Sequence, residues 1–139
     1  MKIHESAENY LETILVLQQR KGSVRSIDIA NELEFSKPSV SVAMKNLRLN
    51  GYIEMDGSGL ISLLPAGRAI AEAVLEKHRL MTEFLMALGV SPQVAAEDAC
   101  RIEHVLSDES FEAIKNHIKK YTEKYGPQKR SLLFCRNMV

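Results

Sequence analysis

The segment 26–63 constrains the fold more than any other part of this chain, because two short helical patterns are followed directly by a hairpin pattern. Apolar residues recur at helical spacing in 26–33 and again in 36–50. Two β-prone runs, 52–55 and 60–63, then flank the turn sequence DGSG. This order of elements predicts a winged helix-turn-helix, in which the second helix enters the major groove of DNA.

Both helices of this segment carry start or stop signals. Ser26 is expected to cap the first helix and Ser36 the second, while Gly51 is well placed to end the second. Helical spacing predicts that the first helix turns inward Ile27, Ile29, Ala30 and Leu33. The second helix is expected to bury Val40, Ala43, Met44 and Leu47.

The second helix leaves small hydroxyl and cationic side chains opposite its apolar stripe. Serine hydroxyls near a helix N-terminus bond phosphates or base edges, and lysine and arginine neutralise phosphates. A solvated helix face is the alternative for any one of these residues, but the order of elements favours DNA binding for the set. The residues predicted to contact double-stranded DNA are Arg25, Ser36, Lys37, Pro38, Ser39, Ser41, Lys45, Arg48 and Ser58.

The charge balance restricts how such a chain binds DNA. Its 18 Lys and Arg residues equal its 18 Asp and Glu residues, so any DNA affinity must come from local clustering of cations. Composition alone is equally compatible with an ordinary soluble enzyme. No apolar run approaches the ~20 residues that span a bilayer, which argues against a membrane role. Two cysteines and a charged N-terminus predict a reducing, cytoplasmic setting.

Helical patterns also flank the predicted DNA-binding segment. The long pattern that starts at Pro65 is a natural connector and dimerisation element. We expect a mainly α chain, with a winged helix-turn-helix domain and its two-stranded wing in residues 1–71. An all-helical metal-binding and dimerisation domain is expected in residues 72–139. The predicted flanking helices are 5–20, 65–88, 92–106 and 108–125.

One of these helices carries a cluster of metal-ligand types. Cys100, Glu103 and His104 stand at positions i, i+3 and i+4, which places a thiolate, a carboxylate and an imidazole on one helix face. The thiolate favours iron, cobalt, nickel or zinc over magnesium or calcium. Taken singly, each residue has an ordinary alternative as a surface or packing side chain. Further candidate ligands on other helices are His78, Glu12 and Asn9.

Four segments resemble the family of metal-dependent repressors that includes the diphtheria toxin repressor and the manganese transport regulator. They are NYLETI, DIANELEFSKPSVSVAMKNLRLNGYIE, LPAGRAIA and EDACRIEHVLSDE, and the likeness covers about residues 5–125. The resemblance implies a winged-helix domain followed by a helical dimerisation domain, with metal bound between the first helix and the later ones. It also implies repression of metal-uptake genes when metal is abundant.

The resemblance carries metal-ligand roles onto particular residues. Cys100, Glu103 and His104 match the iron-responsive members, whereas manganese-responsive members have Glu at the position of Cys100. Glu12 instead matches the manganese type. Asn9 matches neither type, because the family has Met or Asp there.

His78 aligns with a ligand of both types. Thr82 and Ala96 stand where the iron type has a further Glu and His, so a complete second site of that kind is not expected. The likeness is to a short form without the SH3-like domain of longer members.

Together these features predict a homodimeric repressor that takes Fe(II), or else Mn(II), as effector and acts on no small-molecule substrate. Co, Ni or Zn are expected to bind in vitro. Metal would fix the spacing of two recognition helices near one turn of DNA, roughly 34 Å. The alternatives are a redox regulator that uses Cys100, a protein-interaction module on the same scaffold, and a metal-dependent helical enzyme. No His has a Glu three residues before it, which disfavours a di-iron enzyme.

Overall fold

The computed structural model describes residues 5–125, with side chains to residue 120. It divides into two compact units, Met1–Val74 and Leu75–Val139. No helix among the described residues is long and apolar enough to cross a membrane. Residues 126–139, which belong to the second predicted domain, lie outside the described part of the chain.

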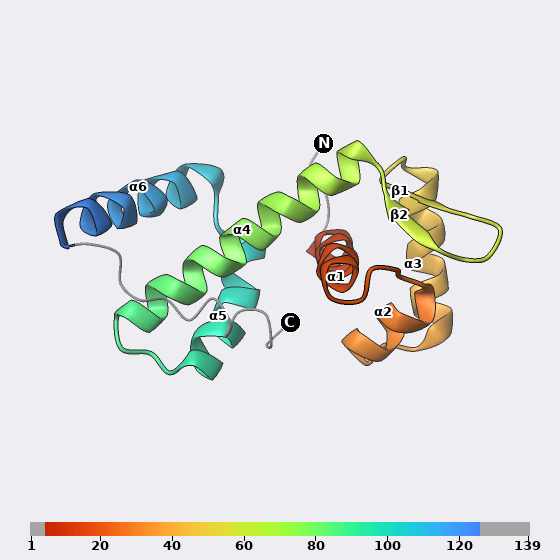
Figure 1. Ribbon diagram of the computed structural model, residues 1–139, viewed down its shortest axis with the longest axis horizontal. Helices are drawn as coiled ribbons and strands as arrows, with labels where there is room; N and C mark the ends of the chain where they lie inside the picture. The colour runs from red at the N-terminus through yellow and green to blue at the C-terminus, as the bar shows by residue number, and fades with distance from the viewer. Residues whose placement is uncertain (1–4, 126–139) are drawn as a thin grey trace. The chain divides into compact units, whose positions relative to one another are not determined.

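The first unit contains three helices, a two-stranded hairpin and the start of a fourth helix (Figure 1). The strands pair antiparallel, with Ile53 opposite Leu63 and Met55 opposite Ile61. Apolar residues of the helices and of both strands form the buried core, which includes Leu11, Ile14, Ile29, Val40, Met44, Ile53 and Ile61. The elements are α1 (Glu5–Lys21), α2 (Ser26–Leu33), α3 (Lys37–Leu49), β1 (Ile53–Met55), β2 (Ile61–Leu63) and α4 (Pro65–Ala87).

The start of α2 differs from the sequence prediction in two ways. Arg25, not Ser26, is the N-cap residue, and its backbone N–H donates to the Asp28 carboxylate at 2.9 Å. An acidic residue in the first helical turn therefore satisfies the backbone where a serine hydroxyl was expected. Ile27 was predicted to face inward but is 40% exposed, because the buried side of this short helix is narrow and is filled by Ile29 and Ala30.

The ends of α3 agree with the prediction. The Ser36 hydroxyl accepts a hydrogen bond from the Ser39 backbone N–H at 3.3 Å. This bond satisfies one of the first four backbone N–H groups, which have no acceptor within the helix. At the other end Gly51 adopts φ 78°, and Tyr52 N–H donates to the Leu47 carbonyl at 3.0 Å. This Schellman ending needs a left-handed residue, which glycine supplies without strain.

The first turn of α4 lies against the backbone that leads into β1. A Cβ atom on Gly67 would lie 2.1 Å from the Tyr52 carbonyl oxygen. The same carbonyl accepts the Leu64 N–H at 3.0 Å. The absence of a side chain at Gly67 therefore allows α4 to begin directly after the wing.

The second unit is built from the later part of α4 together with α5 (Pro92–Val105) and α6 (Asp108–Tyr125). Ser107 Oγ accepts the Ser110 N–H at 3.1 Å at the start of α6. The ion pair of Lys77 with Asp108 ties α4 to α6. Within the described part of this unit, the buried apolar residues are Leu75, Met81, Ala95, Ala96, Ala99 and Phe111.

Candidate metal centre and nucleic-acid interface

The exposed face of α3 carries the residues predicted to contact DNA. Met44 and the other buried residues of the helix face the core, while every predicted DNA-contacting residue on α3 and at its N-cap is exposed. The helix contains no acidic residue, so this face is positively charged. The exposed residues in question are Ser36, Lys37, Pro38, Ser39, Ser41, Lys45 and Arg48.

Two of these hydroxyl groups also form hydrogen bonds within the protein. Besides capping the helix, Ser36 Oγ donates a hydrogen bond of 2.7 Å to Ser39 Oγ. Val42 and Asn46 share the exposed face and were not predicted from the sequence. Helical spacing places both away from the buried stripe, so a search not restricted to hydroxyl and cationic side chains would have found them.

The wing is ordered by hydrogen bonds at its tip. Asp56 Oδ1 accepts the backbone N–H groups of Leu60 and Ser58, both at 2.9 Å, and the Ser58 hydroxyl at 2.8 Å. These bonds, the one from Leu60 foremost, hold the pKa of Asp56 below its usual value. Arg25 donates from its guanidinium to the Ser58 carbonyl at 3.0 Å, so it also braces the tip.

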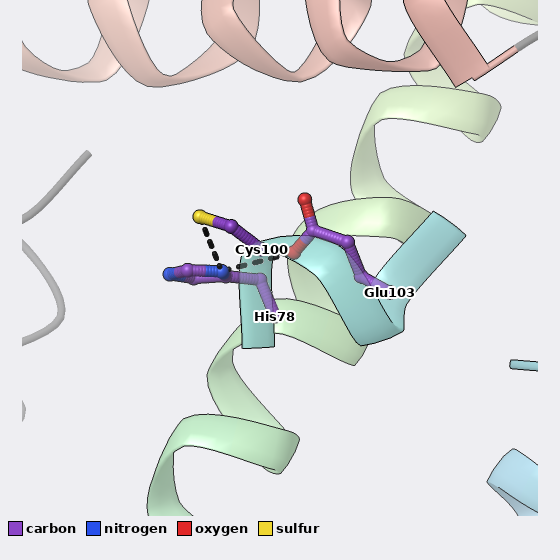
Figure 2. Close-up of side chains that lie close together, drawn as sticks. All are labelled: His78, Cys100 and Glu103. Atoms are coloured by element: carbon purple, nitrogen blue, oxygen red, sulfur yellow. Dashed lines mark hydrogen bonds and ion pairs between the residues drawn. The ribbon is translucent and has the colours of Figure 1, made fainter. Parts of the chain in front are cut away.

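The candidate metal centre lies between α4 and α5 (Figure 2). His78 and Glu103 are almost fully buried, and His78 Nδ1 lies 2.9 Å from Glu103 Oε2. Cys100 Sγ lies 3.7 Å from the same nitrogen. One ligand atom from each of the three residues lies within 4.8 Å of the other two. The sequence predicted two of these residues on one face of α5, and the fold brings in His78 from α4.

The remaining predicted ligands occupy different positions. His104 Nε2 lies 3.3 Å from Glu103 Oε1, so the Glu103 carboxylate lies between two imidazole rings. Glu12 is a buried carboxylate on α1 of the first unit, and Asn9 is half-buried one turn earlier. The Asn9 backbone carbonyl accepts the Thr13 hydroxyl at 2.8 Å.

The donor set in the second unit fits a divalent transition metal. Ligand bonds of ~2.0–2.3 Å allow two donors of one ion to stand up to about 4.6 Å apart. The donor atoms of His78, Cys100 and Glu103 all lie within 4.8 Å of one another, and His78 Nδ1 lies 2.9 Å from Glu103 Oε2 and 3.7 Å from Cys100 Sγ. Nitrogen, sulfur and oxygen donors together suit iron, cobalt, nickel or zinc. His78 and Glu103 are buried, and a buried carboxylate needs a positively charged or hydrogen-bonding partner.

Thr82 and Ala96 are both buried but add no ligand of the kind that the iron-type pattern has there. The Thr82 hydroxyl donates to the His78 backbone carbonyl at 2.7 Å. His117 is exposed on α6 and is not part of the cluster.

Comparisons with known proteins agree on both units. Residues 2–59 match the family model described as iron dependent repressor, N-terminal DNA binding domain. Residues 64–129 match the model described as iron dependent repressor, metal binding and dimerisation domain.

Individual relatives show the same likeness. The chain is 34% identical over 122 residues to the transcriptional regulator MntR of Escherichia coli, covering 88% of this chain and 76% of that protein. It is 34% identical over 106 residues to the diphtheria toxin repressor of Corynebacterium diphtheriae, covering 76% of this chain and 47% of the repressor.

Among solved structures, a manganese-dependent transcriptional repressor in complex with manganese matches with a TM-score of 0.75 and 26% identity. The match covers 88% of this chain and 54% of that one. The chain thus spans about half the length of this structure and of the diphtheria toxin repressor.

Proposed function

This chain belongs to the family of metal-dependent transcriptional repressors, and from that premise we propose that it represses metal-uptake genes as a homodimer when Fe(II), or else Mn(II), is bound. The observation that carries the proposal is the meeting of His78, Cys100 and Glu103 in the second unit of a chain that also has a winged helix-turn-helix. The family consists of DNA-binding regulators and not of enzymes.

We place Fe(II) ahead of Mn(II) because of Cys100. A thiolate donor favours the softer metals, whereas an all-oxygen and nitrogen set suits manganese better. A divalent ion supplies the positive charge that lets a buried carboxylate and a thiolate share one small volume. His78 must be neutral and Cys100 deprotonated to act as ligands, so binding releases protons.

His104 and Glu12 are proposed as further ligands on chemical grounds. His104 already shares the Glu103 carboxylate with His78, so its imidazole is at hand for an ion held by Glu103. Glu12 is a buried carboxylate, and the family resemblance implies a ligand of the manganese type at its position. Asn9 offers only an amide oxygen, which is a weaker donor than a carboxylate, so we rank it last among the candidate ligands.

The proposed DNA interface is the exposed face of α3 with the wing. Lys37, Lys45 and Arg48 neutralise phosphates, and the serines near the start of the helix contact phosphates or base edges. Two such helices in a homodimer read two half-sites of an operator. Metal can raise the affinity for DNA only if it binds the conformation that binds DNA more tightly than the conformation that does not. The gain in DNA affinity cannot exceed this difference in metal affinity.

The test is fluorescence anisotropy with the DNA upstream of the chain's own coding sequence, under anaerobic conditions. Binding is measured in chelator, in Fe(II) and in Mn(II), for the wild type and for Glu103→Ala. The wild type is expected to bind at least tenfold more tightly with metal, and Glu103→Ala is expected to lose this gain.

Glu112→Ala is the matched control, because Glu112 is an exposed glutamate of the same unit. It should respond to metal as the wild type does. Thermal melting in chelator checks that Glu103→Ala is folded. Equal binding with metal and with chelator would refute the metal mechanism and leave a Cys100 redox switch or constitutive binding. Loss of binding on oxidation alone would identify the redox switch.

A further inference from the structure

Two large apolar side chains stand exposed on α3. Val42 is 61% exposed and Leu49 is 72% exposed. Packing does not explain Val42, because the apolar stripe that enters the core of the first unit is formed by Val40, Met44 and Leu47. The Val42 side chain therefore stands on the exposed face of α3, where a partner that binds this face can contact it.

The position of Val42 on the helix points to the covering partner. Successive residues of a helix are turned by about 100°, so Val42 lies about 200° from both Val40 and Met44, opposite the buried stripe. Pro38, four residues earlier, and Lys45, three residues later, are exposed on the same side. The early part of a recognition helix contacts base edges, whereas Leu49 lies in the last turn of α3.

The chemistry of valine restricts what it can recognise in a major groove. Valine neither donates nor accepts a hydrogen bond, and the apolar feature of base edges in that groove is the C5-methyl group of thymine. Two nearby hydroxyls, those of Ser36 and Ser39, are already hydrogen-bonded to each other. We infer that Val42 selects thymine at one position of each operator half-site by packing against its C5-methyl group. This inference rests on the proposed function, because it requires α3 to lie in the major groove.

The experiment begins with a duplex enriched from a random-sequence pool by the full chain in Mn(II), which does not oxidise in air as Fe(II) does. Each thymine of that duplex is then replaced singly by deoxyuridine, which removes the methyl group and keeps the hydrogen-bonding edge. The wild type is expected to lose about fourfold in affinity at one thymine per half-site, which corresponds to the ~0.8 kcal/mol of one buried methyl group.

Val42→Ser is the decisive variant, because serine and valine have similar helix propensities and the site is exposed. It should bind the thymine duplex about fourfold more weakly than the wild type and should not distinguish thymine from deoxyuridine. Thermal melting is expected to show an unchanged fold. Leu49→Ser, the matched control, should keep the full preference for thymine.

The other outcomes distinguish a failure of the Val42 contact from a failure of the proposed DNA-binding function. A Val42→Ser protein that still prefers thymine fourfold overturns the inference, as does an enriched duplex with no thymine sensitive to deoxyuridine. An affinity that depends on methylation of a cytosine, and is lost in Val42→Ser, would move the contact to 5-methylcytosine and overturn the assignment to thymine. A pool from which no duplex is enriched in Mn(II), nor in a repeat with Fe(II) under anaerobic conditions, overturns the proposed function and this inference with it.

Discussion

Gly67→Ala is expected to destabilise the protein although alanine is the better helix former. In an unencumbered helix interior the change stabilises by about 1 kcal/mol. Here the new Cβ atom would lie 2.1 Å from the Tyr52 carbonyl oxygen and 2.9 Å from its carbonyl carbon, against an ordinary contact of 3.4 Å or more. The helix start or the Tyr52 backbone must therefore move by more than an ångström.

Tyr52 has little freedom to move. Its N–H donates to Leu47 at the end of α3, and its carbonyl accepts the Leu64 N–H, so displacement loses a hydrogen bond worth about 1 kcal/mol. Overpacking adds roughly 1–3 kcal/mol or more. After the gain in helix propensity is subtracted, we expect a net loss of about 1–3 kcal/mol in the free energy of unfolding.

The assay is equilibrium urea unfolding of the full chain in chelator, followed by far-ultraviolet circular dichroism. Gly57→Ala is the matched control, because a Cβ atom there meets nothing within 4 Å and its φ is not positive. It should change stability by less than about 0.5 kcal/mol. A Gly67→Ala protein as stable as the wild type, or more stable, would refute the contact argument.

Three further predictions concern charge, metal and pH. Lys45→Gln should weaken DNA binding at all sequences and lower the slope of log affinity against log salt by about 1, whereas exposed Lys119→Gln on α6 should leave the slope unchanged. Cobalt-loaded wild type should show a thiolate-to-cobalt absorption band that Cys100→Ser lacks and Cys135→Ser keeps; a band retained in Cys100→Ser would remove Cys100 from the ligand set. The Lys21 ammonium, helped by the Arg25 N–H, holds the pKa of Asp28 below its usual value of 3.8, so the ionised carboxylate stabilises the fold above that pH. The stability difference between wild type and Asp28→Asn in urea should therefore be constant near neutral pH and shrink as the pH falls below about 4; a difference that does not vary with pH would contradict the ion pair.

The sequence alone determined the order and type of the elements, because helix periodicity, caps and turn residues are local properties. Ser36, Gly51 and the DGSG turn act on backbone within a few residues of themselves, so the limits of α3 and of the hairpin followed from the printed letters. The cluster of Cys100 and Glu103 was equally visible, since one helix turn brings them together. The family resemblance supplied the proposed role of that cluster.

The tertiary structure decided which side chains from different elements meet. No local pattern could place His78 Nδ1 at 2.9 Å from Glu103, because 25 residues and the turn between α4 and α5 separate them in the chain and only the packing of α4 on α5 closes that distance. Nor could it show that Gly67 has to lie against the Tyr52 backbone, that Arg25 braces the wing, or that Ile27 remains exposed. Burial depends on what covers a side chain, and that is a property of the whole fold and not of the spacing along one helix.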